Sequence, residues 1–396
     1  MTIEISLEDP ALVADPYPHF AQWRAAGKAQ WHPGLGMYLA ATYADANAVL
    51  RSKALGRVWT DRQPDDLWTT FNWLHSDSIL ENEPPKHTRL RALVAKAFVR
   101  GEIERLRPAV IRIAAELLDA AAAKREATGH FDVIADYAEP LPVAIIAELL
   151  GVPEDRREQL RPWSQRIVKM YDYDKTAEDE RLAREASDEF AEFMRELIDE
   201  RRRQPGDDLL SILVDVESEG ERLNERELVA TGVLLLNAGH EASVNGFGNG
   251  LVQLLARADA AAAVRRDPRG TAPTLIEEML RFDSPLQLFE RTAKQDVEVA
   301  GVHLRAGEKI AALLGSANRD PQVFTDADTF DIHRDPNNHI AFGAGIHFCL
   351  GAPLARLELL ETVPMLFERF PELDFAAEPV QRETFVLRGY HSVPVA

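Results

Sequence analysis

The chain has 396 residues, 46% of them hydrophobic, and its 65 acidic and 45 basic side chains give a formal net charge of −20 at pH 7. Such an acidic chain disfavours binding to a phosphate backbone, so we expect no nucleic-acid partner. The single cysteine excludes an internal disulfide framework and gives no sign of an oxidising compartment.

The N-terminal stretch has acids where a signal peptide needs basic residues followed by an apolar run. No stretch approaches the roughly 20 consecutive apolar residues that span a bilayer. We therefore expect a cytoplasmic globular protein without a membrane partner.

Helical periodicity dominates the chain, and strand-like signals are short. Residues 36–50 indicate a strand followed by a helix, and apolar spacing predicts helices over 101–125 and 178–203. A longer helix, over 224–257, begins with Asn224 and Glu227 in the positions of an N-cap and its capping-box partner. Its middle, VLLLNAG, is apolar on all sides, so we expect a buried central helix. Residues 296–315 alternate and have glycines where hairpins turn.

These elements predict one mostly helical domain over residues 1–396. A small β region is expected apart from the helices. At about 1.5 Å per residue, the helix over 224–257 would be about 50 Å long. That length is enough to cross the whole domain.

The only cysteine, Cys349, lies in the stretch FGAGIHFCLG, residues 342–351. A lone cysteine is most often a small buried hydrophobe. The functional alternatives are a thiol nucleophile activated by a histidine and a thiolate that binds a metal. Zinc is disfavoured, because His347 and Cys349 are two residues apart and no CxxC motif supplies further ligands.

The composition of this loop favours a large planar partner. Its glycines leave the backbone bare for close approach to a flat group, and Phe342 and Phe348 would shield the sulfur from water. A helix is expected just after the cysteine, and its positive dipole end would stabilise a thiolate. Thiolate ligation of haem iron requires these features.

The loop resembles the FGxGxHxCxG signature of bacterial cytochromes P450, through Phe342, Gly343, Gly345, His347, Cys349 and Gly351. Other landmarks of that family occur in order along the chain: HTRLR at 87–91, EEMLR at 277–281 and ANRDPQVFTDADTFDIHR at 317–334. The resemblance implies a mainly α cytochrome P450 fold, with a large helical region and a small β region. Haem b would lie between the long central helix and the cysteine loop, with Cys349 as the axial ligand of its iron.

The resemblance also implies which residues surround the haem. Four match the family's propionate contacts, and four others are expected elsewhere around the ring: His87, Arg91, Arg291 and His347, then Ala238, Phe342, Gly343 and Gly351. Glu278 and Arg281 match a buried pair that locks its helix to the segment before the haem loop, with Arg334 as the third partner. That role is structural rather than catalytic.

On the oxygen side of the haem, the family has the pattern AGx(D/E)T, an acid followed by an alcohol in a locally opened helix turn. Ala238, Gly239 and Glu241 fit, but Ala242 stands where the family has threonine, and Ser243 follows it. Adjacent helical residues point about 100° apart, so Ser243 cannot take the place of a hydroxyl at 242. Either protons pass from Glu241 through ordered water or a substrate hydroxyl, or the chemistry needs no relay.

Substrate contacts are expected from a tryptophan-rich segment that resembles the family's substrate-covering loop, from residues 284–289, and from the C-terminal segment. The residues are Trp59, Trp68, Phe71 and Trp73, then Leu286, Gln287, Leu288 and Phe289, and finally Val386 and Leu387. For the tryptophan-rich segment, the alternative is a local aromatic core. Together these residues indicate a lipophilic or aromatic substrate, with Gln287 available for one polar group.

The resemblance predicts a monooxygenase that inserts one oxygen atom from O₂ into a lipophilic small molecule, by hydroxylation or oxidative dealkylation. Electrons would come from an external ferredoxin and its NAD(P)H reductase. The departure at Ala242 leaves open a haem-thiolate enzyme that uses peroxide or rearranges its substrate. A haem-binding sensor without turnover and a cysteine hydrolase are the remaining alternatives.

Overall fold

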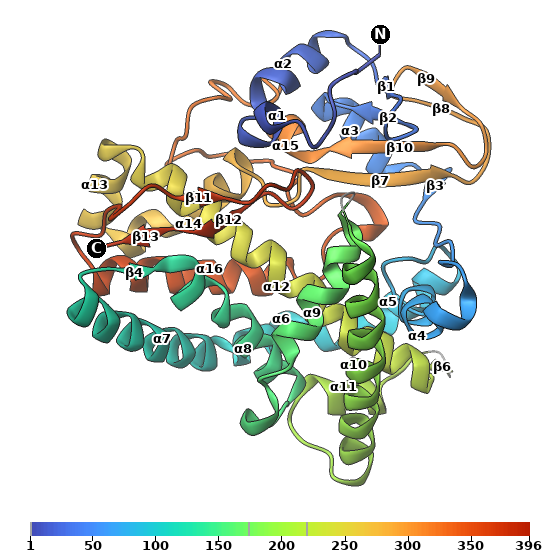
Figure 1. Ribbon diagram of the computed structural model, residues 1–396, viewed down its shortest axis with the longest axis horizontal. Helices are drawn as coiled ribbons and strands as arrows, with labels where there is room; N and C mark the ends of the chain where they lie inside the picture. The colour runs from blue at the N-terminus through green and yellow to red at the C-terminus, as the bar shows by residue number, and fades with distance from the viewer. Residues whose placement is uncertain (1, 173–174, 219–220) are drawn as a thin grey trace. The chain divides into compact units, whose positions relative to one another are not determined.

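The structure, a computed structural model, describes residues 2–172, 175–218 and 221–396 (Figure 1). The chain forms two compact units. The first comprises Met1–Gly56, Ala114–Glu139 and Ala242–Ala396, and the second comprises Arg57–Ile113 and Pro140–Glu241. The single domain expected over residues 1–396 stays a prediction.

The second unit is built mainly from helices. In chain order they are α4 (Asp65–Ser76), α5 (Lys86–Ala95), η1 (Lys96–Phe98), α6 (Arg100–Arg105), α8 (Pro140–Leu150), η3 (Glu154–Arg156), α9 (Leu160–Val168), η4 (Lys169–Tyr171), α10 (Ala177–Arg203) and α11 (Leu209–Asp215). Strands β5 (Glu217–Ser218) and β6 (Glu221–Arg222) pair with each other in antiparallel orientation. The predominance of helices that the sequence predicted is therefore confirmed in this unit.

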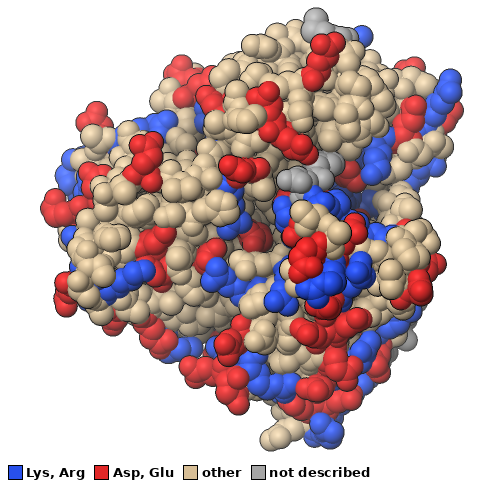
Figure 2. All heavy atoms as spheres, viewed as in Figure 1, with Lys and Arg blue, Asp and Glu red and all other residues tan. Residues whose placement is uncertain are grey.

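Helix α10 confirms the periodicity expected over 178–203. Thr176 and Asp179 form a capping box at its start, in which each side chain accepts the other residue's backbone N–H. The four residues of the expected apolar face are buried: Phe190, Phe193, Leu197 and Ile198. On the exposed face, Arg181 pairs with Glu178 and Glu185. In the view of Figure 2, acidic and basic side chains lie interspersed on the surface.

Two helices, α7 (Arg107–Thr128) and α12 (Glu225–Leu255), each have residues in both units. Helix α12 confirms the long helix expected from 224 and ends close to the expected residue. Asn224 Oδ1 accepts the Glu227 N–H, and Glu227 Oε2 accepts the Asn224 N–H, both at 3.0 Å. The expectation that the middle of this helix is buried all round is wrong for Ala238, which is exposed.

The helix expected over 101–125 is interrupted. Helix α6 ends at Arg105 and α7 begins at Arg107, so the prediction of one continuous helix is wrong at Leu106. Pro108 explains the break, because proline has no N–H to donate and its ring clashes with the carbonyl four residues back. Proline is tolerated in the first turn of a helix, which is its position in α7.

The first unit contains the main sheet, with the strand order β1 (Gln30–His32), β2 (Met37–Ala40), β10 (Lys309–Leu313), β7 (Leu288–Ala293), β3 (Leu55–Gly56). Strands β2 and β10 run parallel, and the other neighbours are antiparallel (Figure 1). Strand β2 and the following α3 (Tyr43–Arg51) confirm the elements expected over 36–50. Both faces of the sheet are buried, because alternate residues of β10 join two different core clusters.

The segment 296–315 forms a hairpin and a further strand, as predicted. Strands β8 (Val297–Val299) and β9 (Val302–Leu304) pair in antiparallel orientation, and β10 follows. Ala300 and Gly301 make the two-residue turn with positive φ angles of 51° and 70°. Such a turn matches the right-handed twist of the paired strands.

The remaining helices of the first unit are α1 (Pro10–Ala14), α2 (Tyr17–Ala25), the π-helix η2 (Ile134–Ala138), α13 (Ala258–Arg266), α14 (Pro268–Phe282), α15 (Leu314–Ala317), η5 (Gly345–His347) and α16 (Ala352–Arg369). Its small strands pair as β4 (Phe131–Asp132) with β13 (Pro394–Val395), and β11 (Val380–Gln381) with β12 (Tyr390–Ser392). Among the described residues, no helix combines the length and apolar character needed to cross a membrane.

Candidate active site

The only cysteine lies in a partly buried loop just before α16 and is itself exposed. The Cys349 N–H donates to the Phe342 carbonyl at 3.0 Å, and the Ala352 N–H donates to the Cys349 carbonyl at 3.4 Å. The thiol side chain is exposed, so Cys349 is not the small buried hydrophobe that the sequence left open. The amino end of α16 follows directly, and its dipole stabilises a thiolate at this position.

Two glycines of the loop are required by its backbone. Gly343 and Gly345 both have φ of 73°, in the left-handed region that favours glycine. A Cβ on Gly345 would lie 2.5 Å from the Leu50 carbonyl oxygen at the end of α3. A Cβ on Gly343 would meet no atom of the described residues within 4 Å, so its requirement is conformational alone. The loop shape is therefore fixed by glycine rather than by side-chain packing.

The cysteine loop exposes apolar side chains as well as the thiol. Ile346 and Phe348 are 44% and 40% exposed, and the rings of Phe342 and Phe348 lie 6.4 Å apart. The guanidinium of Arg356 lies 4.6 Å from the Phe342 ring centroid, which fixes that ring from one side. A soft sulfur among exposed apolar groups fits a large flat cofactor with a soft metal, and so fits haem. It does not fit zinc, which needs several nitrogen or sulfur ligands close together.

A buried ion pair anchors α14 to the segment before this loop. Glu278 and Arg281 are fully buried and joined by two hydrogen bonds of 2.7 and 2.8 Å. Arg281 also donates to the carbonyls of Asn318, Ala327 and Thr329. Glu278 accepts a further bond from Arg334 at 3.1 Å, which confirms Arg334 as the third partner. Every charge in this cluster therefore has a partner.

A second network holds the first residues of the cysteine loop. Arg356 of α16 donates two hydrogen bonds to Glu277 of α14, at 2.6 and 2.9 Å. His339 Nε2 donates to Glu277 Oε2 at 2.9 Å, and His339 Nδ1 accepts the Ala341 N–H at 3.2 Å. Burial alone would raise the pKa of Glu277, but the bonds from Arg356 and His339 outweigh it and lower that pKa to about 2. Sequence reasoning did not single out Glu277 or His339.

The lowered pKa of Glu277 predicts a specific dependence of stability on acidity. The unfolded carboxyl has a pKa of about 4.3, so its contribution is complete above that pH and is lost as pH falls toward 2. We expect Glu277→Gln to lower the free energy of unfolding by about 1–3 kcal/mol near neutral pH and to flatten the acid limb of the stability curve. Thermal midpoints measured from pH 7 to pH 3 check this. Glu368→Gln is the exposed control, and an acid limb unchanged in Glu277→Gln would contradict the assignment.

The expected propionate contacts lie in both units. In the first unit, Arg291 of β7 is 2% exposed, and its guanidinium lies 4.4 Å from the Phe289 ring centroid. His347 lies in η5, two residues before the cysteine. In the second unit, His87 is buried and Arg91 half-buried, one turn apart on α5. The contacts of these four residues with a haem stay predictions.

The candidate oxygen-side residues lie in an unbroken part of α12, which corrects the expected local opening of the helix. Glu241 is 7% exposed and lies 3.8 Å from His240 Nδ1. A Cβ on Gly239 would lie 2.4 Å from Ile146 Cδ1, so α8 packs directly on this glycine. Ala242 and Ser243 are both half-buried. Ala242, which has no hydroxyl, is therefore the position at which this segment departs from the family pattern AGx(D/E)T.

The glycines further along α12 are explained by close packing inside the first unit. A Cβ on Gly248 would lie 2.7 Å from Ile134 Cδ1, and one on Gly250 would lie 2.4 Å from Met279 Cβ. Glycine costs about 1 kcal/mol relative to alanine in a helix. Contact of the neighbouring side chains with bare backbone offsets that cost.

Comparison with known proteins identifies the family. The profile of the cytochrome P450 family matches residues 39–269 and 272–385, which is most of the chain. The chain belongs to the cytochrome P450 family. Its mainly helical fold with small sheets and its haem-thiolate cofactor are those of this family, as the sequence predicted.

Relatives of this P450 include enzymes of known reaction. Cytochrome P450 monooxygenase PikC of Streptomyces venezuelae is 38% identical over 390 residues, which are 96% of this chain and 91% of the relative. The 6-deoxyerythronolide B hydroxylase of Saccharopolyspora erythraea is 41% identical over 336 residues, 84% of this chain and 80% of the relative. The structure of CYP109E1 from Bacillus megaterium in complex with testosterone has a TM-score of 0.85 and 33% identity, and the match covers 96% of this chain and 99% of that chain. This P450 is accordingly a monooxygenase that acts on small molecules.

The tryptophan-rich segment of this P450 forms an aromatic cluster within the second unit. Trp68 is 3% exposed and its ring lies 5.1 Å from that of Phe71, edge to face. Trp73 is 8% exposed, and the guanidinium groups of Arg195 and Arg226 lie 5.5 and 5.1 Å from its ring centroid. These are the contacts of the local aromatic core that the sequence left open as the alternative. Trp59 is half-buried and stacks on His75, with ring centroids 4.5 Å apart.

The structure brings residues 286–287 and 386–387 together but does not place 286–289 on one surface. The Gln287 N–H donates to the Val386 carbonyl at 2.9 Å, and Leu286 forms an isolated bridge with Leu387. Leu286 and Phe289 pack against one core cluster, whereas Leu288 belongs to the other. Leu288 therefore faces away from Phe289, as alternation along β7 requires.

Gln287 is not oriented as an open polar contact. Its side chain is fully buried, its Nε2 donates to the Ser284 carbonyl at 2.7 Å, and a Cβ on Gly315 would meet its Oε1. The side chain thus packs against the backbone of α15. A role for Gln287 in binding a polar group of the substrate stays a prediction.

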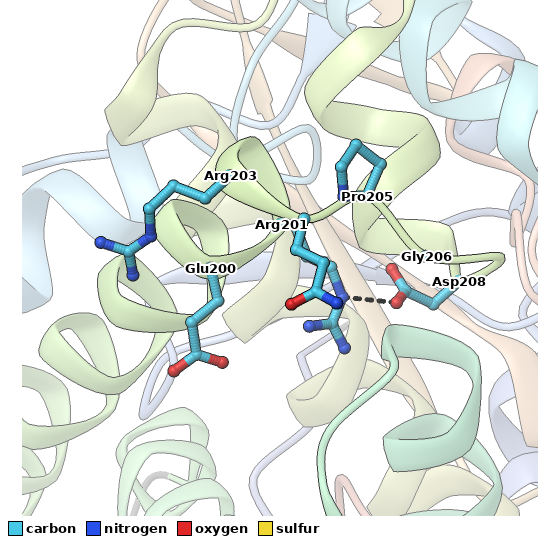
Figure 3. Close-up of a pocket in the computed structure, with 7 residues that line it drawn as sticks. Glu200, Arg201, Arg203, Pro205, Gly206 and Asp208 are labelled. Atoms are coloured by element: carbon cyan, nitrogen blue, oxygen red, sulfur yellow. Dashed lines mark hydrogen bonds and ion pairs between the residues drawn. The ribbon is translucent and has the colours of Figure 1, made fainter.

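A charged hollow at the end of α10 lies outside this chemistry (Figure 3). Arg201 and Asp208 form its ion pair at 2.5 Å, and Arg201 also donates to the Gly151 carbonyl. The pair ties the end of α10 to the start of α11, where Asp208 is the N-cap residue. These contacts of Arg201 and Asp208 indicate a structural role within the second unit.

Proposed function

We propose that this P450 inserts one oxygen atom from O₂ into a lipophilic small molecule, by hydroxylation or oxidative dealkylation, with Cys349 as the thiolate ligand of haem b. The observation that carries the proposal is the exposed thiol in a glycine-shaped loop at the amino end of α16. When bound, the haem supplies reductive activation of O₂. A hydroxylase among the relatives and a related structure with testosterone support a lipophilic substrate.

The protein's own residues hold and shield the cofactor in this proposal. The positive amino end of α16 favours a negative charge on the Cys349 sulfur. Phe342 and Phe348, whose rings lie 6.4 Å apart in the same loop, would shield the sulfur from water once the cofactor is bound. Arg291 and His347, with His87 and Arg91 of the second unit, neutralise the propionates through charge-assisted hydrogen bonds.

Proton delivery is assigned to Glu241. A buried carboxyl on a helix is a suitable proton donor, because burial restricts water and directs exchange through few groups. Ala242 has no hydroxyl to pass the proton on, so ordered water or a hydroxyl of the substrate completes the relay. The wild-type protein would then convert less of its reducing power into product than a relative with threonine at this position.

Substitutions on α12 test this relay. We expect Glu241→Gln to lower the rate of product formation about 10²-fold, the usual size of a general-acid contribution. We expect Ala242→Thr to raise the ratio of product formed to NADH consumed, because a hydroxyl then stands beside the acid. Both variants are assayed with a ferredoxin and its NAD(P)H reductase, the external electron donors that we propose for this enzyme. Ala256→Thr, just beyond the helix, is the matched control.

The same assay separates the proposal from its rival. If product forms with hydrogen peroxide but not with O₂ and the ferredoxin system, the protein is a peroxide-using haem-thiolate enzyme. If Glu241→Gln retains the full rate of O₂-dependent product formation, Glu241 is not the proton donor.

A further inference from the structure

A small polar niche lies inside the second unit, one helical turn before Glu241 on α12. Five polar residues line it: His75, Ser78, Glu81, Tyr171 and Asn237. Leucine, isoleucine and valine side chains line the remaining surface. The niche is partly open and leaves room for one group of about the size of a water molecule. Its lining comes from α4 and the segment after it, from α9 and η4, and from α12.

Hydrogen bonds fix the polarity of one wall. The His75 Nδ1 lies 2.7 Å from the Phe71 carbonyl, so this nitrogen carries the proton and donates. Burial lowers the pKa of His75 to about 4, and the neutral ring then has an acceptor at Nε2. Tyr171 lies 3.0 Å from that Nε2 and must donate its O–H to it. The phenol oxygen of Tyr171 therefore presents only acceptor lone pairs to any further partner.

Asn237 lines the same niche from α12. Its side chain is 6% exposed, and its Oδ1 has no hydrogen-bond partner among the residues that the structure describes. A buried amide oxygen without a partner has lost its hydration and gained nothing in return, so a ligand group that satisfies it gains affinity. The amide also carries two N–H donors. Asn237 thus offers both an acceptor and donors to a group bound in the niche.

The charge of Glu81, which lines the niche, is balanced by Arg57. Glu81 accepts two hydrogen bonds from Arg57, one of them at 3.1 Å, and the two side chains are 7% and 16% exposed. Their charges cancel at short range, and His75 is neutral. A charged ligand group would therefore lose its hydration here without a counter-ion. The chemistry favours a neutral group that donates one hydrogen bond and accepts another.

We propose that this niche binds a hydroxyl group of the lipophilic substrate, with the hydroxyl donating to Tyr171 Oη or Asn237 Oδ1 and accepting from the Asn237 amide. The inference rests on the proposed function, because it names the polar group of that enzyme's substrate. The sequence predicted that Gln287 binds a polar group of the substrate, and we propose Asn237 for that role. Asn237 lies four residues before Glu241, on the same face of α12. Tyr171 and His75 position the acceptor, and Asn237 determines the specificity.

The test compares n-octanol with its isomer heptyl methyl ether, which has the same atoms but no O–H. Isothermal titration of the purified haem-loaded protein should give about tenfold tighter binding of octanol. Asn237→Leu and the smaller Asn237→Ala should each reduce this preference to about twofold or less. Asn47→Leu, in α3 of the first unit, is the matched control and should retain the full preference.

Several outcomes would overturn the proposal. Equal affinities for the two isomers would mean that the niche holds only water, and a lack of octanol binding would exclude the hydroxyl ligand. Tighter binding of octyltrimethylammonium than of octanol would exclude a neutral niche. A preference unchanged in both Asn237 variants would place the hydroxyl elsewhere. The carbon monoxide spectrum of the same reduced sample reports separately whether the haem-thiolate assignment holds.

Discussion

Replacing Cys349 with serine is expected to remove the red-shifted Soret band of the dithionite-reduced protein under carbon monoxide, together with nearly all O₂-dependent product formation. The chain has no second cysteine that could take over as the thiolate. A serine hydroxyl is a hard ligand that stays protonated near neutral pH, so it cannot replace the electron donation of the soft sulfur. Absorption spectra with and without carbon monoxide, and turnover with the ferredoxin system, measure both effects.

Ile346→Val is the control for the Cys349 experiment. It alters another exposed side chain of the same loop but keeps the thiol, so the red-shifted band should remain. If Cys349→Ser kept that band, the thiolate would not be the ligand and the proposed function would fail. If the wild-type protein bound no haem at all, the family's cofactor would be absent and the cysteine hydrolase would return as an alternative.

Replacing Arg281 with alanine is expected to lower the free energy of unfolding by about 3–5 kcal/mol, the usual cost of breaking a buried ion pair from one side. The substitution leaves the fully buried Glu278 carboxylate without its bidentate partner. It also leaves the carbonyls of Asn318 and Ala327 without this donor, whereas the Thr329 carbonyl keeps a hydrogen bond from Arg334. Thermal unfolding followed by circular dichroism gives the loss in stability.

Arg181→Ala is the matched control, because its pairs with Glu178 and Glu185 are about half exposed on each side. Exposed pairs contribute about 0–1 kcal/mol, so this variant should unfold close to the wild-type temperature. A thermal midpoint of Arg281→Ala equal to that of the control would mean that the buried cluster does not anchor α14. Loss of haem without loss of stability would instead point to a local role in shaping the cysteine loop.

Local sequence rules predicted the elements whose causes are local. The capping pair Asn224 and Glu227, the apolar spacing of α10 and the glycine at the β8–β9 turn each act within a few residues, so the sequence displays them directly. The break between α6 and α7 is equally local, since Pro108 causes it, but the apolar period alone predicts one continuous helix there. Motif spacing likewise identified Cys349, Glu278 and Arg281.

Features that depend on distant segments were not predictable in the same way. Nothing near Gly250 in the sequence indicates that Met279 packs on it. The residues at 286–289, which the sequence assigned together to the substrate pocket, do not reveal that both faces of the sheet are buried, and therefore that Leu288 and Phe289 enter different clusters. The polar niche combines residues 75, 171 and 237, which only the tertiary fold brings together. Specificity is thus harder to read from sequence than cofactor chemistry.

The two attachments at the start of the cysteine loop affect how tightly a cofactor can be held. The Ile340 N–H is bonded to Asn318 Oδ1 at 2.8 Å, and the Ala341 N–H to His339, whose other nitrogen is held by Glu277. Fixing a backbone residue costs about 1–2 kcal/mol in conformational entropy. Here that ordering occurs when the protein folds, not when the ligand arrives. Binding energy from the proposed sulfur–iron bond and from apolar contacts would then appear almost fully as affinity, which is the thermodynamic benefit of preorganisation.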